Sequence, residues 1–209
     1  MVSKLVSLAA QLKCQLATPN CIAILGSMYF GDQQTEAICT AFGYQLALAK
    51  NLCLLTGGVT GVPKVVSQSF WRSPPDASCH IYHLQPQGFA PLDYGKNIVA
   101  GDNLIQKRWL LAQLAAVYVL FSGGPGTDQE VRWALENGAT IIPVGISGGC
   151  AEQLHQELTQ NAAWLDQQWR SPKNLRYWHR MNDPRAAIED IAEAIYELSL
   201  YSVFNRAKK

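Results

Sequence analysis

The chain has 209 residues, of which 48% are apolar, and its 17 Lys and Arg residues almost balance its 16 Asp and Glu residues, giving a net charge of +1. This composition excludes wholesale disorder, and the length fits one α/β domain better than two small ones. The charge balance argues against a nucleic-acid partner, which normally requires a basic surface that neutralises many phosphates. A small ligand with one or two phosphates stays compatible, because a few well-placed donors suffice.

Six cysteines are present, but no two form a C-x-x-C pair, so neither a zinc knuckle nor a redox motif is indicated. Near the N-terminus the apolar residues are interrupted by Lys4, Gln11 and Lys13, which argues against a signal peptide. No apolar stretch approaches the roughly 20 residues of a membrane span. We therefore expect a reduced, soluble, cytoplasmic protein with no membrane partner, no metal site and no cofactor.

In chain order, a helix within residues 1–18 is followed by short apolar runs that alternate with helical stretches. Runs that are apolar on both faces are typical of central parallel strands. The alternation predicts the α/β class: a single Rossmann-like, three-layer domain over residues 1–209, with a parallel sheet and helices on both faces. The predicted strands are 21–25, 52–55, 80–84, 98–100, 117–121 and 141–146, and the predicted helices among them are 34–50, a short helix that ends near 70, 103–115 and 127–137.

The last part of the domain, residues 150–200, is predicted to be a helix-rich tail. One helix is expected over 150–168 and another over 184–200, with Asp183 as the N-cap of the second helix and a proline at its first position. Residues 201–209 are expected to be a flexible end. The six tryptophans are too dispersed along the chain for a stacking platform, and several are expected to pack in the core or in a subunit contact.

Three of the predicted strands end in turns that contain glycine. All three turns fall at the carboxyl edge of the predicted sheet, where open parallel sheets bind their ligands. Glycine lets a backbone approach an anion closely, and free amides at the start of the following helix can donate to it. The candidate phosphate-binding residues are Gly26 and Ser27 in the first turn, Gly57, Gly58 and Gly61 in the second, and Gly123, Gly124, Gly126 and Thr127 in the third.

The third turn also has a plainer interpretation. Thr127-x-x-Glu130 has the form of a capping box, in which Glu130 would reach back to the start of its own helix. Two Gly-Gly turns that lead into helices from one edge of one sheet favour a phosphate site over this alternative. The spacing matches neither G-x-G-x-x-G nor a Walker loop, which argues against an ordinary dehydrogenase or NTPase.

Glu130 lies one helical turn beyond the third glycine turn, so its carboxylate would face the sugar of a bound nucleotide. There it could act as a general base, or stabilise positive charge on a sugar carbon whose bond to a base is breaking. Lys107 and Arg108, on the preceding helix, could supply a cation to a phosphate or a leaving group. The alternative for these two residues is a pair of exposed helix charges.

The strand followed by Gly-Gly-Pro-Gly-Thr-x-x-Glu resembles the G-G-x-G-T-x-x-E signature of the LOG ("lonely guy") family, formerly labelled lysine decarboxylase-like, within the SLOG Rossmann-like superfamily. The resemblance covers about 21–198. It implies cleavage of the N-glycosidic bond of a nucleoside 5′-monophosphate, with Glu130 as the catalytic glutamate. The Arg-Lys pair of that family stands here as Lys107-Arg108, and its Pro-Gly-Gly begins with Ser122.

Two functions follow as alternatives. The first is a nucleoside 5′-monophosphate phosphoribohydrolase in which Glu130, Arg108 and Lys107 are catalytic. The second is a non-catalytic binding protein: a sensor of a nucleotide such as ADP-ribose, or a carrier resembling the molybdenum-cofactor carriers that share the scaffold. Glu130 favours the first function, and the altered residues Lys107 and Ser122 favour the second. Both take a small-molecule nucleotide ligand, and the resemblance implies a homodimer or a larger homo-oligomer.

Overall fold

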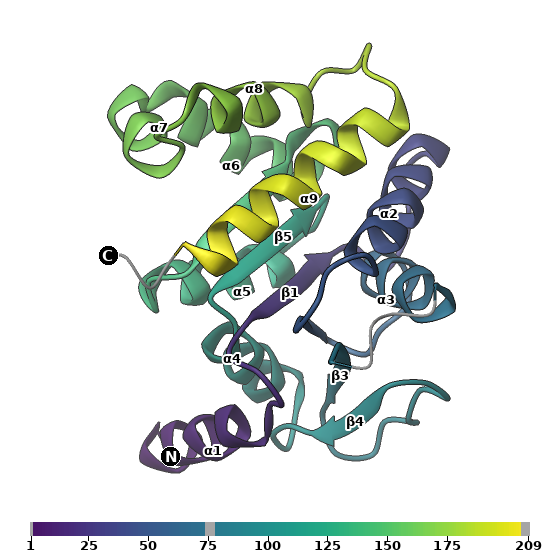
Figure 1. Ribbon diagram of the computed structural model, residues 1–209. Coiled ribbons are helices and arrows are strands. Elements are labelled where there is room, and N and C mark those ends of the chain that lie inside the picture. Colours follow the sequence, from purple (N-terminus) through teal and green to yellow (C-terminus); the bar gives the residue numbers. More distant parts are fainter. Residues whose placement is uncertain (1, 74–77, 206–209) are drawn as a thin grey trace.

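The computed structural model describes residues 2–73 and 78–205, with side chains from residue 4 onward. Its strands are β1 (Cys21–Gly26), β2 (Cys53–Thr56), β3 (His80–Gln85), β4 (Lys96–Val99), β5 (Val117–Phe121) and β6 (Thr140–Val144). They form one parallel sheet in the order β4-β3-β2-β1-β5-β6 (Figure 1). The chain builds outward from β1 to β4 and then crosses over to add β5 and β6 beside β1. The direction of winding therefore reverses between β1 and β5, and such a switch point is where doubly wound sheets bind ligands.

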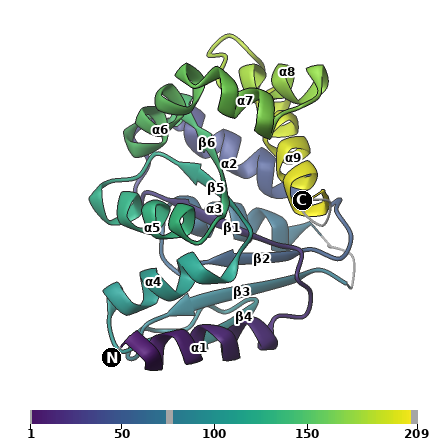
Figure 2. The same ribbon diagram turned by 90° about the vertical axis from the view of Figure 1, so that its left-hand side faces the viewer.

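Helices cover both faces of this sheet (Figure 2). Side chains alternate along each strand, so Ile22 and Ile24 of β1 enter the core on one face, while Ala23 and Leu25 enter the core on the other. The predicted single α/β domain of Rossmann-like, three-layer form is confirmed, and every predicted strand is present to within two residues at each end. The helices on the first face are α2 (Gln33–Leu46), α3 (Val62–Arg72) and α9 (Ile188–Phe204), and those on the second are α1 (Val2–Gln15), α4 (Leu104–Leu114) and α5 (Pro125–Glu136).

The limits of several elements follow from single residues. The side chain of Asn103 accepts the amide of Gln106 (3.0 Å) and starts α4. Gly138, at φ +74°, follows the end of α5, where the left-handed conformation is easily reached by glycine. Pro143 lies within β6, an edge strand, where the missing backbone donor can face away from the ladder.

The C-terminal tail differs from the sequence prediction in its helices. The helix expected over 150–168 is divided at Asn161, whose side chain accepts the amide of Trp164 (3.0 Å) and so starts a new helix. A further helix, which was not predicted, begins at Pro172 with Ser171 as its N-cap, and its Ser-Pro start signal is visible in the sequence. The elements of this region are the 3-10 turn η1 (Gly145–Ser147), α6 (Gly149–Gln160), α7 (Ala162–Gln168) and α8 (Pro172–Arg180).

The last helix, α9, begins at Ile188, one turn later than predicted. Asp183 accepts the amide of Arg185 (2.9 Å), so it closes an isolated turn instead of capping the helix. Because α9 continues to Phe204, the first part of the expected flexible end is helical, and residues 206–209 lie outside the described residues. Among the described helices, none combines the length and apolar character needed to cross a bilayer.

Three tryptophans that are separate in the sequence pack together in the tail. The rings of Trp164 and Trp169 lie 5.6 and 5.8 Å from that of Trp178, and His155 stacks on Trp178 at 5.0 Å. The sequence predicts no stacking platform, and these three rings instead join the core, where α7 and α8 bring them to one place. Trp169 and Trp178 are fully buried, so the cluster belongs to the core.

Candidate functional site

The three glycine-bearing turns meet at the carboxyl edge of the sheet, beside the switch between β1 and β5. The amide of Gly123 donates to Oγ of Ser27 (3.0 Å), which joins the third turn to the first. The amide of Val62, next to Gly61, donates to the carbonyl of Ser27 (3.0 Å), which joins the second turn to the first. Ser27, in the first turn, is thus hydrogen-bonded to both of the other turns.

The third turn has an unusual backbone that a neighbouring segment fixes. Ser122 and Gly123 both have positive φ angles, +50° and +98°. The amide of Ser122 donates to Oγ of Ser147 (2.6 Å), while the amides of Cys150 and Ala151 donate to the carbonyls of Gly123 and Ser122 (both 3.0 Å). The first turn of α6 therefore braces the loop. The sequence analysis did not identify this brace, and the Gly148-Gly149 pair before it is the only signal of a specialised turn there.

The start of α5 presents donors to solvent. Gly124 is the N-cap and Pro125 the first helical residue, and the amides of Thr127 and Asp128 donate to the carbonyl of Gly124 (3.0 and 2.9 Å). The amides of Gly124 and Gly126 donate to no described residue. No heavy atom lies within 4 Å of the position that a Cβ would take on Gly124, apart from its neighbours in the chain. An anion can therefore approach the positive end of this helix.

The capping-box interpretation of this segment is wrong. The N-cap is Gly124 and not Thr127, and no side chain caps the helix. Glu130 does not reach back to the helix start, because its carboxylate contacts Lys107 of α4 instead.

Lys107 and Glu130 form a buried ion pair. Nζ of Lys107 lies 3.2 Å from Oε1 of Glu130, and the two side chains are only 6% and 9% exposed. The ammonium also lies against the second turn, since a Cβ on Gly57 would be 2.8 Å from it. Burial raises the pKa of Glu130 above its usual value, against the opposing attraction of Lys107 and then of Arg108.

Arg108 reaches the third turn from the same helix. A Cβ added to Gly126 would lie 2.6 Å from Cζ of Arg108, so the guanidinium lies over the first turn of α5. The interpretation of Lys107 and Arg108 as two exposed helix charges is therefore wrong: the first is buried and the second is half-buried. The two cations have different neighbours, because Lys107 is paired with Glu130 while the guanidinium of Arg108 lies beside Gly126.

At two of the predicted positions, close packing alone is enough to require glycine. A Cβ on Gly26 would lie 2.6 Å from the carbonyl oxygen of Phe121 and 2.7 Å from Cγ1 of Val62. Gly61 has φ +72°, and a Cβ there would lie 2.5 Å from the carbonyl oxygen of Met28. These contacts hold the turns together, and direct contact of either glycine with a phosphate stays a prediction.

The second turn rests on a buried hydrogen-bonded chain that the sequence analysis missed. The amide of Gly58 donates to Oγ1 of Thr56 (3.1 Å), and that hydroxyl is 2.7 Å from Nδ1 of His83 on the next strand. The His83 ring meets Tyr94 edge to face at 4.9 Å, and its Nε2 has no hydrogen-bond partner among the described residues. Burial lowers the pKa of His83 to about 4, so the ring is neutral at pH 7.

The chemistry of this edge suits an oxyanion. It combines two free amides, a helix start and the guanidinium of Arg108. A second cation, Lys107, is paired with the carboxylate of Glu130. Among the described residues, no group of three or more His, Cys, Asp and Glu side chains gathers in a way that could hold a metal ion.

A sequence model of the SLOG cluster4 family matches residues 19–174, about three quarters of the chain. The chain belongs to the SLOG cluster4 family. The SLOG relationship expected from the glycine signature is thereby confirmed, whereas the narrower LOG assignment stays a prediction. Every candidate site residue lies inside the SLOG cluster4 segment, and α9 lies outside it. A comparison with curated protein sequences gives no match.

Solved structures share the fold of this SLOG cluster4 chain. TM1055, a structural-genomics target, is 24% identical over 65% of this chain and 80% of its own, with a TM-score of 0.57. The molybdenum cofactor binding protein of Rippkaea orientalis and the molybdenum cofactor carrier protein of Chlamydomonas reinhardtii are each 22% identical over 58% of this chain and 73% of their own, with TM-scores of 0.47. The likeness to TM1055 concerns the fold alone, and the two cofactor proteins contribute no argument here.

Proposed function

We propose that this SLOG cluster4 protein binds a nucleotide and holds its phosphate at the start of α5. The observation that carries the proposal is the pair of undonated amides, Gly124 and Gly126, at the start of α5, with the guanidinium of Arg108 beside Gly126. The hydroxyl of Thr127, which makes no hydrogen bond to a described residue, adds a further donor beside them. Hydrogen bonds to a charged group contribute about 1.5–3 kcal/mol each, so these few donors suffice for a phosphate monoester.

Exposed apolar side chains near the turns favour a nucleotide over free phosphate as the ligand. Met28 and Tyr29 directly follow Ser27 and are 48% and 80% exposed. An exposed aromatic ring next to a phosphate site offers a flat surface on which a base can stack. The position of the site at the β1–β5 switch agrees with this assignment, because doubly wound sheets bind nucleotides there.

Hydrolysis of the N-glycosidic bond is the second candidate, and Glu130 is the observation that favours it. A carboxyl group one helical turn beyond a phosphate turn, with its pKa raised by burial, has the properties of a general acid or base. Lys107 neutralises this carboxylate in the structure, however, and the pair is almost fully buried. Cleavage would require Lys107 to turn toward the ligand and free Glu130 for the sugar, and for this reason binding is the primary proposal.

Ligand panels separate these proposals. We expect AMP, another nucleoside monophosphate, ADP-ribose or a molybdopterin-type ligand to raise the melting temperature, and calorimetry to show binding at least tenfold weaker in Arg108→Gln. Arg132→Gln, which removes an exposed arginine from the same helix α5, is the matched control and should bind as the wild type does. Absence of binding by every phosphate ligand, or equal affinity in the two variants, would contradict the proposal.

Base release is measured in the same panel by chromatography. Release of a free base that is lost in Glu130→Gln, with binding retained, would establish the hydrolase; tight binding without release would leave a sensor or a carrier. Tyr29→Ala tests the base contact, since it should weaken AMP binding and leave ribose 5-phosphate binding unchanged.

A further inference from the structure

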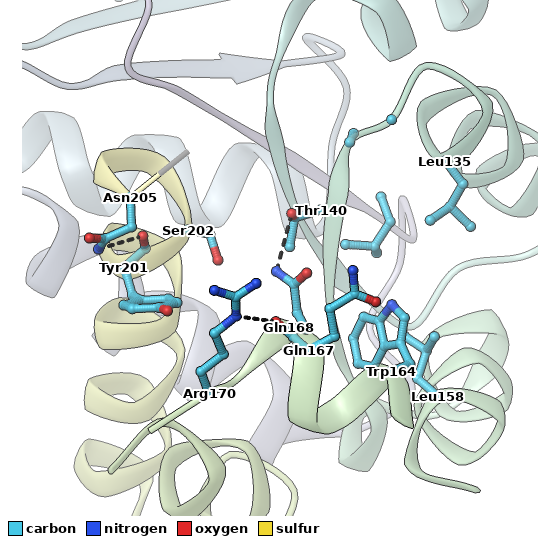
Figure 3. A pocket seen from close by; sticks show the side chains of 13 residues that line it. Leu135, Thr140, Leu158, Trp164, Gln167, Gln168, Arg170, Tyr201, Ser202 and Asn205 are labelled. Atoms are coloured by element: carbon cyan, nitrogen blue, oxygen red, sulfur yellow. Dashed lines mark hydrogen bonds between the residues drawn. The ribbon is translucent and has the colours of Figure 1, made fainter. Parts of the chain in front are cut away.

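A pocket lies at the amino-terminal edge of the sheet, opposite the glycine turns. It has a volume of about 360 Å³ and is enclosed by the start of β6, the end of α5, the helix α7 and the end of α9 (Figure 3). This volume falls in the range of about 300–1,000 Å³ that is typical of small-molecule sites. The residues that α9 contributes lie outside the segment that matches the SLOG cluster4 family, so this pocket is not part of the site described above.

This pocket contains a cation that forms no ion pair with a described residue. Nε of Arg170 donates to the carbonyl of Gln167 (3.3 Å), which anchors the guanidinium and leaves its two terminal nitrogens toward the pocket (Figure 3). Arg170 is the only charged residue among the described residues that line the pocket, and no described carboxylate lies within 4 Å of its guanidinium. An anchored guanidinium with both terminal nitrogens free has the geometry that accepts a carboxylate bidentately.

A buried hydroxyl beside this cation also lacks a partner. Ser202 is only 4% exposed, lines the same pocket, and its Oγ makes no hydrogen bond to any described residue. Ser199, one turn earlier in α9, shows the usual solution, because its hydroxyl donates to the carbonyl of Ile195 (2.6 Å). Burying an unsatisfied hydroxyl costs free energy, so a ligand that reaches Oγ of Ser202 from the pocket would recover that cost.

Three apolar side chains lie on the opposite side of the pocket, with the amide of Gln167 beside Trp164. Figure 3 shows Leu135, Leu158 and Trp164 on one side, and Arg170 and Ser202 toward the other. Trp164 is held in place by its ring contacts with Trp169 and Trp178, so this wall is rigid.

We propose that this pocket binds a small aromatic carboxylate, with its ring against Trp164 and its carboxylate between Arg170 and Ser202. One guanidinium balances one negative charge. A carboxylate therefore fits better than a phosphate monoester, which carries about −1.5 to −2 charges at pH 7 and would leave charge uncompensated.

The test uses three probes that share a naphthalene ring and differ in the group at position 2: 2-naphthoate, the neutral naphthalene-2-carboxamide, and 2-naphthyl phosphate. Each probe is titrated by calorimetry and ligand-detected NMR. We expect 2-naphthoate to bind at least tenfold more tightly than the other two. Arg170→Gln should weaken 2-naphthoate binding by tenfold or more, and Arg176→Gln, an exposed arginine on α8, should leave the affinity unchanged. Arg170 is exposed, so its replacement should not affect folding, and unchanged melting temperatures would check this.

Ser202→Ala gives a second readout. It should weaken 2-naphthoate binding severalfold and raise the melting temperature of the free protein, because it removes a buried hydroxyl that has no partner. Equal affinity for the carboxamide, tighter binding of the phosphate, displacement of 2-naphthoate by excess AMP, or unchanged binding in Arg170→Gln would each overturn the proposal. The AMP competition also keeps this pocket distinguishable from the site at α5.

Discussion

Replacement of Lys107 by methionine removes the partner of a buried carboxylate while it keeps the length and the apolar part of the side chain. The carboxylate of Glu130 then stays in a site where its side chain is only 9% exposed. Removing one partner of a buried pair is usually far more destabilising than losing an exposed pair, because the remaining charge is left without compensation.

The size of the effect has a ceiling that can be worked out. A buried carboxyl can escape this penalty by taking up a proton, so the penalty for the unpaired charge does not exceed the free energy of protonating the carboxyl at the working pH. With an ordinary pKa of 4.5, this ceiling is about 3.4 kcal/mol at pH 7 and about 0.7 kcal/mol at pH 5. We expect Lys107→Met to lower the free energy of unfolding by about 3 kcal/mol at pH 7.

The loss of stability in Lys107→Met should depend on pH in a defined direction. In the variant the folded chain holds a proton on Glu130 that the unfolded chain has released, so the free energy of unfolding rises as the pH falls. The slope relative to the wild type should approach about −1.4 kcal/mol per pH unit between pH 5 and pH 7. Urea unfolding at several pH values, followed by the fluorescence of the buried tryptophans, measures it directly.

Two further variants complete the test. Arg132→Met breaks the exposed pair between Arg132 and Asp128 and should leave both stability and its pH dependence unchanged. Lys107→Met combined with Glu130→Leu replaces the whole pair by apolar groups and should recover most of the loss. A change below about 1 kcal/mol in Lys107→Met, without pH dependence, would refute the reasoning, because Glu130 would then be hydrated or held by Arg108.

Two other predictions concern the supports of the glycine turns. Because the pKa of His83 is lowered to about 4 from 6.5, the folded chain binds fewer protons than the unfolded chain between these values, and acidification from pH 7 to pH 5 should cost about 2 kcal/mol of stability. His83→Asn, which keeps an amide near the Nδ1 position, should remove that part of the pH dependence; an unchanged profile would contradict the assignment. Gly123→Ala should destabilise by about 2 kcal/mol or more in urea unfolding, since its φ is +98° and the added Cβ would lie 2.6 Å from Sγ of Cys150. Gly138→Ala, at φ +74° with open space around it, should cost only about 1 kcal/mol, and equal losses would show that the brace from α6 is unimportant.

The sheet could be predicted from the sequence because its strands are covered on both faces. A run such as Val117–Phe121 is apolar throughout, so its limits are plain without knowledge of its neighbours. The glycine turns were found for a similar reason, since each lies directly after such a run. The tail was predicted less well, because the N-caps of the short helices α7 and α8 are Asn161 and Ser171, and these single polar side chains decide where each helix begins.

The partners within the candidate site could not be predicted, because they are set by tertiary contacts. Lys107 and Glu130 are 23 residues apart, and nothing local indicates that one neutralises the other. The same holds for His83, which supports a turn that follows a different strand. Single-sequence reasoning identified which residues gather at the edge of the sheet, and the structure added which of them are already paired and which are free.

The brace between the third turn and α6 has a consequence for motion. The carbonyls of Ser122 and Gly123 accept the first amides of α6, while the amides that follow them open α5. Neither helix start can therefore fray without disturbing the same two peptide groups, and the loop and both helix ends should open together as one cooperative unit. Native-state hydrogen exchange would then give the amides of Cys150 and Ala151 a common opening free energy, and a ligand at α5 would slow exchange at α6 that it does not touch.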